Sequence, residues 1–482
     1  MKYYITTAID YINGKPHIGH SYEKVAADVL ARWHRLKGEQ VFFLTGTDEH
    51  GAKIAEFAAK QDQQPQAFAD ENFQNFKLAW DNLGLSYDRF IRTTDKDHLK
   101  AVETILKKIK ESGHLYEGEY TGMYCVGHEA FLTEKDLVDG LCPEHGTKPE
   151  IITEKNWFFK VSSFTAQIKE AIVSGTFKIW PEERKNEILS LLDQGFNDIA
   201  ISRPNVQWGI PLPWDKKQTV YVWVDALINY ISGVGYVGDK ELFKKFWPAD
   251  WHVVGKDIIK FHCIIWPAML LAAGLDIPKG VVGHGYLTAG NKKISKSIGN
   301  VIDPNEWVSK YGSDAVRYFL MREISFGQDG DVSEEKLQSR YEGDLANGLG
   351  NLVSRLTNMI EKYCHGEVPH TVSPEMNLSE IDLLLENFKF HEALQKIWEA
   401  IAWSNQYIDE TKPWQVAKDN QEEVEAILSK LAAEVQVIGY FLAPFMPDTA
   451  EKIRLAFESD TITKIEPLFP RIEEEVLPSI LL

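Results

Sequence analysis

Two short segments of this 482-residue chain carry side chains suited to binding phosphate groups. His17 and His20 lie three residues apart in Pro16-His17-Ile18-Gly19-His20, directly before a stretch with helical periodicity. The N-terminus of a helix presents free backbone N–H groups and the positive end of the helix dipole to an anion. Two imidazoles can donate further hydrogen bonds to phosphate oxygens, and Gly19 has no side chain to hold off an adenine ring. This segment predicts a nucleotide site, although two ordinary turn histidines are the plainer interpretation.

The second segment is Lys293-Ile294-Ser295-Lys296-Ser297, in a loop flanked by Gly290 and Gly299. Transfer of a nucleotidyl group develops charge on the α-phosphate and on the leaving pyrophosphate. Two lysines that close on these groups would stabilise that transition state. A solvated basic loop is the alternative when the segment is considered alone.

Two cysteine–histidine pairs have the spacing of metal ligands. Cys125 and His128 form the first pair, and Cys142 and His145 form the second after thirteen intervening residues. Thiolate and imidazole ligands in a tetrahedral arrangement favour Zn²⁺. Four protein ligands would leave no open position, so the spacing predicts a structural zinc site. The alternative is two free cysteines and two surface histidines.

The elements around the first segment follow the pattern of a nucleotide-binding α/β fold. Residues 3–8 and 41–44 are predicted as buried strands, and Val25, Val29, Trp33 and Leu36 form a helical stripe between them. Continuous apolar strands are typical of a parallel sheet that is covered on both faces. Ligands of such sheets bind beyond the carboxyl ends of the strands.

The pattern changes twice further along the chain. From about residue 113 to 214, cysteine, histidine, glycine and proline become dense, which indicates an insertion. The α/β pattern resumes at 220–224 and at 251–255. After residue 341 the chain is predicted to be helical, with a polar link at 366–379 and two apolar stripes: Leu345, Leu349, Leu352, Leu356 and Ile427, Leu431, Val435, Ile438.

The charge of the chain argues against a general nucleic-acid binder. The net charge is −19, and residues 341–482 hold 25 acidic and 11 basic residues, a net charge of −14. Phosphate contacts require lysine and arginine, so any RNA recognition must depend on local basic groups, stacking and shape. With only four cysteines and no export signal, we expect a reduced, cytoplasmic protein without a membrane anchor.

The two phosphate-binding segments, in this order and on an α/β background, resemble the two signatures of class I aminoacyl-tRNA synthetases. The chain resembles the methionyl-tRNA synthetase family along nearly its whole length, in particular at 8–11, 221–230 and 256–262. Isoleucyl, valyl and leucyl enzymes carry a large editing domain between the signatures. Here 276 positions separate His17 from Lys293, which is too few for such a domain.

The resemblance implies ATP-dependent activation of L-methionine to methionyl-adenylate and its transfer to tRNA(Met), including the initiator tRNA, with Mg²⁺ on the phosphates. It implies that the catalytic residues are His17, His20, Lys293 and Lys296. It implies that ATP contacts His17, Gly19, His20, Gly255, Asp257, Ile294 and Lys296. The methionine site would contain Asp48 for the substrate ammonium and Ala8, Ile9, Tyr11, Trp223, Ala226, Leu227, Tyr230, Ile258 and His262. A polarisable thioether packs well against aromatic rings, although Leu227 stands where the family more often has proline. The family usually has cysteine at the position of His128, and some members have lost the metal.

Three residues in the helical region match the family positions that read the CAU anticodon. Asn351 and Arg355 are spaced by one helical turn, and Trp414 follows Lys412-Pro413 outside either apolar stripe. Aromatic rings stack unpaired bases, and amide and guanidinium groups read base edges. The plainer interpretation is that Arg355 is a solvated charge and that Trp414 packs between helices.

The expected architecture is a Rossmann-type parallel-sheet catalytic domain, split by a zinc-bearing insertion and followed by an all-α helical-bundle anticodon-binding domain. The expected division is 1–113 and 216–280 for the two catalytic halves, 114–215 for the insertion, 281–340 for the loop and stem-contact region and 341–482 for the anticodon-binding domain. No appended dimerisation domain is recognised, which favours a monomer. Two alternatives stay open: another synthetase without an editing domain, of the cysteinyl type, and a catalytically idle tRNA-binding protein.

Overall fold

The computed structural model describes residues 1–126, 130–132, 134–143, 146–204, 206–290, 292–294, 300–367, 373–459 and 461–472, with the backbone alone at 120, 130, 131, 135 and 293. The described residues group into two compact units. Unit 1 comprises Met1–Pro16, Lys37–Trp80 and Ser86–His284; unit 2 comprises His17–Leu36, Asp81–Leu85 and Gly285–Leu482.

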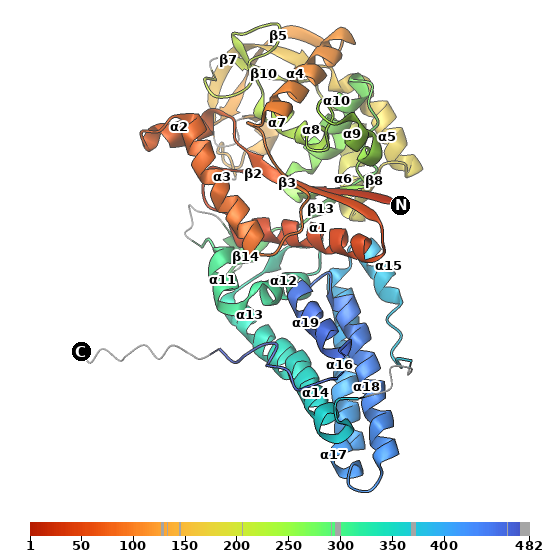
Figure 1. Ribbon diagram of the computed structural model, residues 1–482. Helices are drawn as coiled ribbons and strands as arrows, with labels where there is room; N and C mark the ends of the chain where they lie inside the picture. Colours follow the sequence, from red (N-terminus) through yellow and green to blue (C-terminus); the bar gives the residue numbers. More distant parts are fainter. Residues whose placement is uncertain are drawn as a thin grey trace, which may run out of the picture. The chain divides into compact units, whose positions relative to one another are not determined.

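A parallel sheet forms the centre of unit 1 (Figure 1). Within the described residues it has seven strands: β1 (Lys2–Thr7), β2 (Asp10–Tyr11), β3 (Gln40–Asp48), β4 (Arg89–Arg92), β8 (Lys178–Trp180), β12 (Trp251–Gly255) and β13 (Gly280–His284). The order is β2-β3-β1-β12-β13-β8, with β4 paired to β3, and every pairing is parallel. The predicted parallel α/β sheet is therefore confirmed, and its strands lie where the apolar runs at 3–8, 41–44 and 251–255 predicted them.

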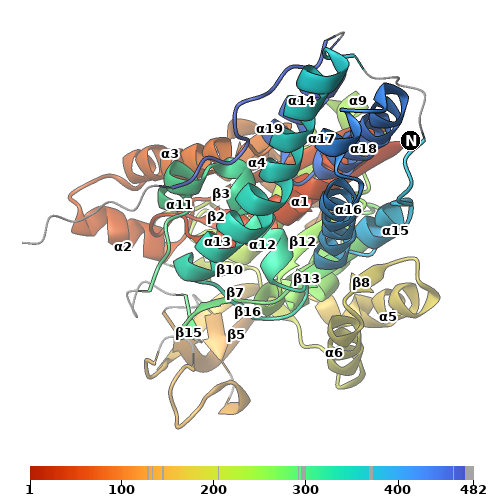
Figure 2. The same cartoon turned by 90° about the horizontal axis from the view of Figure 1, so that it is seen from below.

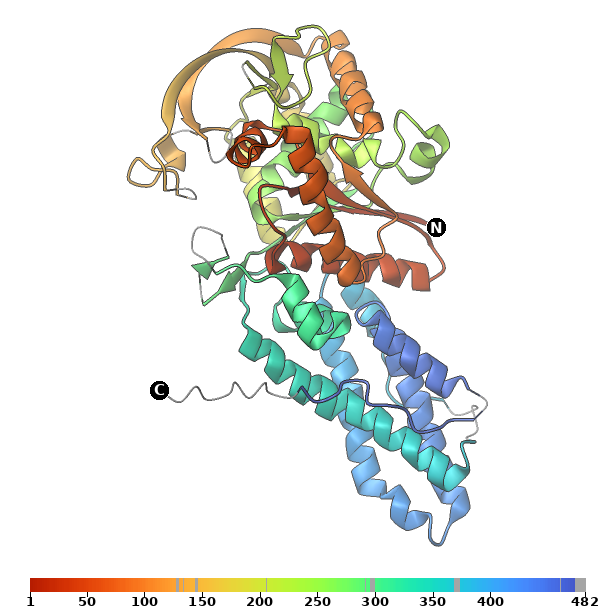
Figure 3. The ribbon, with the colours of Figure 1, turned by 60° about the vertical axis from the view of Figure 1, so that its left-hand side comes forward.

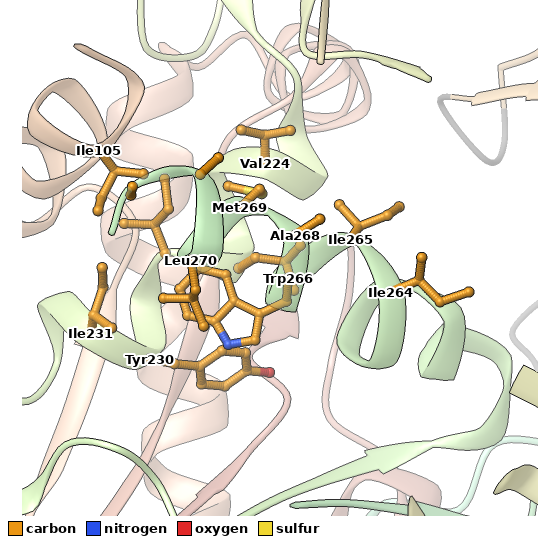
Figure 4. Close-up of a cluster of buried hydrophobic side chains, with 14 of the residues drawn as sticks. Ile105, Val224, Tyr230, Ile231, Ile264, Ile265, Trp266, Ala268, Met269 and Leu270 are labelled. Carbon is orange, nitrogen blue, oxygen red and sulfur yellow. The ribbon is translucent and has the colours of Figure 1, made fainter. Parts of the chain in front are cut away.

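Helices pack on this sheet and around a large apolar core. The helices of this part of the chain are α2 (Ala52–Lys60), α3 (Pro65–Asn82), α4 (Lys96–Glu111), α5 (Thr165–Ser174), α6 (Glu182–Asp193), α7 (Val222–Leu227), α8 (Asn229–Ser232), α9 (Lys240–Phe246) and α10 (Trp266–Ala272). Short 3-10 turns are η2 (Val161–Phe164) and η3 (Lys256–Ile258), and η4 (Phe261–Ile265) is a π-helical turn before α10. Figure 4 shows Trp266 of α10 beside Tyr230 of α8, among side chains from α4, α7 and α8. The two ring centroids are 6.0 Å apart.

The segment predicted as an insertion contains antiparallel sheets. β5 (Leu115–Cys125), β6 (Ala130–Leu132), β7 (Glu150–Phe159) and β9 (Ile199–Ala200) form one sheet in the order β6-β5-β7-β9. The long strands β5 and β7 arch together in Figure 3. A second pair joins β10 (Ser202–Pro204) to β11 (Gln218–Val220), and η1 (Glu134–Asp136) is a 3-10 turn. Between these pieces, β8 pairs with β13, so this stretch also contributes a strand to the parallel sheet.

Unit 2 begins with helix α1 (Ile18–Leu36), whose first turn carries Gly19 and His20. A small sheet has the order β15-β14-β16, formed by β14 (Leu287–Ala289), β15 (Lys292–Lys293) and β16 (Gly330–Asp331). Two helices, α11 (Pro304–Tyr311) and α12 (Ser313–Glu323), lie between β15 and β16 along the chain, and α13 (Glu334–Arg340) follows β16.

The rest of unit 2 is helical, as predicted for the chain after residue 341. Its elements are the π-helical segment η5 (Tyr341–Gly350), α14 (Asn351–Cys364), α15 (Glu380–Glu386), α16 (Phe390–Thr411), α17 (Pro413–Val416), α18 (Gln421–Leu442) and α19 (Pro447–Phe457). The long helices α14, α16 and α18 pack side by side (Figure 2). Both predicted apolar stripes are fully or largely buried. Among the described residues, no helix is long and apolar enough to cross a membrane.

A buried ion pair fixes α1 within unit 2. The Arg317 Nη2 atom of α12 lies 2.7 Å from Asp28 Oδ2 of α1, and neither side chain is exposed. Arg317 also donates hydrogen bonds to the carbonyls of Pro444 and Phe445, both at 2.8 Å. These two residues lie between α18 and α19, so one guanidinium ties the helix that carries His20 to the connection between those two helices.

Replacing Arg317 with methionine should destabilise the protein strongly. It leaves the buried Asp28 carboxylate with the partly exposed Arg32, whose Nε atom also lies 2.7 Å from Asp28 Oδ2, as a remaining cation. Removing one partner of a buried ion pair costs about 3–5 kcal/mol, and we expect a loss near the lower of these figures. The midpoint of urea unfolding, followed by circular dichroism, measures the loss. Lys107→Met removes the exposed ion pair with Glu103 and is the matched control. Equal midpoints for the two variants would contradict the role assigned to Arg317.

Candidate active site

The N-terminus of α1 presents two imidazole N–H groups. The rings of His17 and His20 lie against each other with centroids 3.8 Å apart. The backbone N–H of His17 donates to His20 Nδ1 at 3.1 Å, and the N–H of Gly19 donates to His17 Nδ1 at 3.2 Å. Because each Nδ1 atom accepts, each Nε2 atom carries the proton in the neutral ring. Both rings are therefore set as Nε2–H donors at the positive end of a helix.

Gly19 leaves room for the His17 ring in this arrangement. A Cβ atom at this position would lie 3.0 Å from two atoms of the His17 ring, closer than most such contacts. The N–H of Ile18 donates to the carbonyl of Ile302 at 3.0 Å, which anchors the first turn of α1. A side chain at residue 19 would push on the His17 ring, so the two imidazoles and the glycine act as one geometric set.

The second phosphate-binding segment is described only in part. Lys293 ends β15, where its backbone pairs with Thr288 of β14, and Ile294 is buried. The Lys293 side chain and Lys296 lie outside the described residues. Their predicted contacts with phosphate groups stay predictions.

The predicted methionine-site segment at 221–230 forms two short helices rather than one element. β11 ends at Val220, and α7 and α8 follow. Trp223 stacks on Phe261 with centroids 4.2 Å apart and ring planes inclined by 15°. Ala226 and Leu227 are buried, and Leu227 ends α7, which is where the family more often has proline.

The end of strand β3 brings the predicted ammonium-binding carboxylate beside β2. Tyr11 is the register partner of Asp48 in the parallel β2–β3 pair. Asp48 is largely buried, at 9% exposure. Ala8 and Ile9 lie between β1 and β2, and the N–H of Ala8 donates to the carbonyl of Val253 in β12 at 3.2 Å. These residues lie beyond the carboxyl end of β1, at the edge of a parallel sheet where ligands bind.

Tyr230 and His262 form a buried hydrogen-bonded pair. The His262 Nδ1–H group donates to the carbonyl of Ile258 at 3.0 Å, so the Nε2 atom of the neutral ring accepts. The Tyr230 hydroxyl, 2.7 Å away, donates to that Nε2 atom. The Tyr4 hydroxyl donates to the Tyr230 carbonyl at 2.6 Å, and burial raises the pKa of Tyr4 well above its usual value.

His252 supports this pair from the side. Its ring stacks on Tyr230 with centroids 4.1 Å apart. The Trp266 Nε1–H group donates to His252 Nε2 at 3.2 Å, so the His252 Nδ1–H group donates to Thr6 Oγ1 at 2.7 Å. Burial, with a smaller contribution from His262, holds the pKa of His252 well below its ordinary value. His252 is therefore neutral at pH 7. Tyr230, His252 and Trp266 together form an aromatic wall that these contacts hold in place.

Gly255 and Asp257 lie where β12 ends. A Cβ atom on Gly255 would lie 2.7 Å from Asp257 Oδ1, so any other residue here would displace this carboxylate. The register partner of Gly255 in β13 is His284, which is also largely buried. A bare backbone next to a carboxylate suits the approach of a sugar with paired hydroxyl groups.

The described half of the predicted metal site consists of two buried cysteines. Cys125 ends β5 and is 1% exposed, and Cys142 is fully buried. The N–H of Cys142 donates to the carbonyl of Thr147, and the N–H of Gly146 donates to the carbonyl of Cys142. The other two predicted ligands, His128 and His145, lie outside the described residues. Within the described part, no group of three or more candidate ligands comes together.

The predicted anticodon-reading residues lie on neighbouring helices of unit 2. Asn351 begins α14 and is exposed, and Arg355 follows one turn later. Arg355 Nη2 donates to Asp409 Oδ1 of α16 at 2.7 Å. Trp414 is 37% exposed on α17, which also contacts α14. Arg355 is thus paired rather than merely solvated, and Trp414 is neither fully packed nor fully free of contacts.

The comparisons with known proteins agree with this geometry. The family model described as "tRNA synthetases class I (M)" matches residues 3–148 and 144–357, and the "Anticodon binding domain of methionyl tRNA ligase" matches 370–472. The methionine–tRNA ligase of Caldanaerobacter subterraneus subsp. tengcongensis is 44% identical over 505 residues, covering 98% of this chain and 79% of that protein. The chain belongs to the methionyl-tRNA synthetase family.

Two further relatives support this membership. The methionine–tRNA ligase of Streptomyces coelicolor is 39% identical over 522 residues, covering 98% of this chain and 97% of its own length. A structure of the Mycobacterium tuberculosis methionyl-tRNA synthetase in complex with methionyl-adenylate has a TM-score of 0.91 at 37% identity, covering 98% of this chain and all of that one. The prediction that the chain is an enzyme of the methionyl-tRNA synthetase family is confirmed. The two alternatives, a cysteinyl-type synthetase and a catalytically idle tRNA-binding protein, are set aside.

Several residues of the site carried no sequence signal that we recognised. Phe261 lies in the segment 256–262, but it stacks on Trp223, which is 38 positions away along the chain. His252 looked like one residue of an apolar strand. Asp225 and its two histidine partners, His50 and His98, form a buried cluster that no local spacing indicates.

Proposed function

We propose that this methionyl-tRNA synthetase family member activates L-methionine with ATP and transfers the methionyl group to the 3′ end of tRNA(Met), for initiation and for elongation. The methionine carboxylate attacks the α-phosphorus of ATP and pyrophosphate leaves. A hydroxyl group at the 3′ end of the tRNA then attacks the carbonyl carbon of the adenylate, the methionyl ester forms and AMP leaves. The observation that carries the proposal is the pair of Nε2–H donors, His17 and His20, at the N-terminus of α1. Such donors stabilise phosphate charge without a covalent intermediate.

We assign the catalytic roles to His17, His20, Lys293 and Lys296. The imidazole N–H groups hold phosphate oxygens, and the two lysines neutralise charge on the α-phosphate and on pyrophosphate. Gly19 and Ile294 border the nucleotide, and Gly255 and Asp257 receive the ribose. Mg²⁺ would neutralise part of the phosphate charge, and it is commonly bound through substrate phosphates rather than through a dedicated protein cage.

We assign the methionine site to unit 1. Asp48 binds the ammonium group, and the side-chain pocket is formed by Ala8, Ile9, Tyr11, Trp223, Ala226, Leu227, Tyr230, Ile258 and His262. The stacked Trp223 and the hydrogen-bonded Tyr230–His262 pair support this assignment, because rigid aromatic walls read shape. An apolar pocket rejects a side chain of the wrong size by only a modest factor per methylene, so rigidity matters.

We retain the proposed division of the chain: catalytic halves at 1–113 and 216–280, an insertion at 114–215, a stem-contact region at 281–340 and an anticodon-binding domain at 341–482. The antiparallel sheet of β5, β6, β7 and β9 supports the insertion. The anticodon-binding role rests on Asn351, Arg355 and Trp414. We further propose that the protein is a monomer and acts in the cytoplasm.

Aminoacylation of defined tRNA transcripts tests this function. Initiator and elongator tRNA(Met) should both be charged with methionine, and the same transcripts with a changed anticodon should be charged far more slowly. Charging that ignores the anticodon would contradict the role of unit 2. Charging with cysteine in place of methionine would contradict the amino-acid assignment.

We also propose a structural Zn²⁺ held by Cys125, His128, Cys142 and His145. The two buried cysteines fit such a site, because thiolate and imidazole ligands suit Zn²⁺ in a closed shell. The metal would hold the loops of the insertion together and would take no part in adenylation.

Elemental analysis of the purified protein should find one Zn²⁺ per chain. Cys142→Ser should lose the metal, because it removes one of the two described thiolates. Cys364→Ser also changes a buried cysteine, in α14, and should keep it. Fully active protein that contains no metal would contradict the site.

A further inference from the structure

A buried carboxylate joins the two halves of the proposed methionine site. Asp225 lies in α7, between Trp223 and Ala226, and is 1% exposed. Its Oδ2 atom lies 2.7 Å from His50 Nδ1, and its Oδ1 atom lies 2.7 Å from His98 Nε2. His50 follows β3, two residues after Asp48, and His98 lies in α4. One carboxylate thus contacts two elements other than its own.

The protonation of this cluster follows from its partners. Burial pushes the pKa of Asp225 upward, but the attraction and hydrogen bonds of His50 and His98 outweigh burial and bring it down to about 2. The ionised carboxylate only accepts hydrogen bonds, so His50 donates through Nδ1–H and His98 donates through Nε2–H. Ser232 Oγ of α8 lies 2.8 Å from His98 Nδ1 and extends the cluster to the helix of Tyr230.

The end of β3, which carries Asp48, is followed by Glu49, and Glu49 is held by several hydrogen bonds. Arg92 binds the Glu49 carboxylate with two hydrogen bonds, at 2.7 and 2.9 Å. Thr47 Oγ1 donates to Glu49 Oε1 at 2.7 Å, and the indole N–H of Trp208 donates to the Glu49 carbonyl at 2.5 Å. Glu49, directly after Asp48, is therefore fixed to neighbouring elements, and His50 connects the same segment to α7.

Burying a charge costs desolvation free energy, and well-packed apolar groups often stabilise a fold equally well. The directional hydrogen bonds of a buried charge do something that apolar packing does not, since they fix the relative placement of two elements. Here the two elements carry Asp48, proposed for the substrate ammonium, and Trp223 with Ala226, proposed for the thioether side chain.

We propose that Asp225 is a positioning residue that sets the spacing between the ammonium site and the side-chain pocket, and so determines the length of amino acid that is accepted. The proposal rests on the proposed methionine-activating function. Asp225 touches no substrate in this role and acts through His50 and through α7.

The test compares variants that remove or retain the hydrogen bonds of the cluster. Asp225→Asn replaces an acceptor with an amide N–H that faces an imidazole N–H. His50→Leu removes the donor, whereas the side-chain amide of His50→Asn can place an N–H near the position of Nδ1. Asp193→Asn, which changes an exposed carboxylate of α6, is the matched control.

Kinetics of methionine-dependent ATP–pyrophosphate exchange, normalised by active-site titration, give the readout. Asp225→Asn and His50→Leu should raise the methionine KM tenfold or more while the ATP KM changes less than twofold. Their preference for methionine over ethionine, which is one methylene longer, should fall at least threefold. His50→Asn should stay within threefold of the wild type in both quantities, and Asp193→Asn should match the wild type.

Equal increases in the two KM values, or an unchanged preference for methionine over ethionine, would overturn the proposal, because a merely structural residue gives that result. If Asp225→Asn does not fold, the His50→Asn and His50→Leu pair decides the question alone: equal behaviour of these two variants overturns it. Wild-type exchange is measured in the same experiment, so failure of the proposed function would be seen separately.

Discussion

Replacing Lys296 with alanine should slow formation of methionyl-adenylate by roughly 10²- to 10³-fold, the usual cost of removing one donor that stabilises transition-state charge. The methionine KM should change little, because the lysine acts on charge that develops on the phosphates and not on bound methionine. Pre-steady-state measurement of adenylate formation separates the rate from substrate binding.

Lys292 supplies the matched control. It is exposed on β15, one residue before Lys293, and belongs to neither proposed phosphate contact. Lys292→Ala should therefore adenylate methionine at nearly the wild-type rate. An unchanged rate in Lys296→Ala, together with weakened methionine binding, would contradict the catalytic role of Lys296.

Trp414→Ala should impair aminoacylation while leaving ATP–pyrophosphate exchange almost intact. Loss of one stacked base costs about 1–3 kcal/mol, which corresponds to roughly 5- to 150-fold in tRNA affinity. The exposed part of the indole, on a short helix beside α14, is the surface available to a base. The KM for tRNA(Met) and the exchange rate are the two quantities to compare.

Tyr440 of α18 is a suitable control, since it is another exposed aromatic residue of unit 2, at 45% exposure. Tyr440→Ala should leave the tRNA KM close to that of the wild type. If Trp414→Ala damages exchange and aminoacylation equally, the residue serves packing rather than anticodon reading, and its assignment has to be withdrawn.

The parallel sheet could be predicted because its strands are continuous apolar runs. β1, β3 and β12 coincide with such runs, and the stripe from Val25 to Leu36 lies on α1. A strand that is buried on both faces of a sheet forms a continuous apolar run, and a helix that is buried along one face has apolar residues at helical spacing. The π-helical geometry of η5 leaves no such trace, since Leu345 and Leu349 fit an ordinary helix equally well.

The segment at 220–224 shows the limit of reading apolar runs. Its valines and aromatic residues favour a strand locally, but the strand ends at Val220 and a helix begins at Val222. Asp225, in that helix, is held by two histidines 175 and 127 positions away. Tertiary contacts decide both the helix and the cluster, and the single sequence contains no local signal of them.

The candidate site divides in the same way. His17, Gly19 and His20 were predicted from their types and spacing, because a helix N-terminus is a local feature. The tautomers of His17 and His20 follow from backbone N–H groups within the same turn. The aromatic wall of Tyr230, His252 and Trp266 comes from three separate elements, so no local pattern in the sequence indicates it. The family resemblance predicted Tyr230 as a site residue, but it did not predict the two neighbours that fix the position of Tyr230.

Exchange of labelled pyrophosphate into ATP, measured with purified wild-type protein and single amino acids without tRNA, tests the central claim most directly. We predict exchange that requires methionine and Mg²⁺, with little exchange for cysteine, isoleucine or valine. Exchange driven best by another amino acid would contradict the methionine assignment. Folded protein that binds tRNA(Met) but catalyses no exchange with methionine would contradict the proposed activity itself.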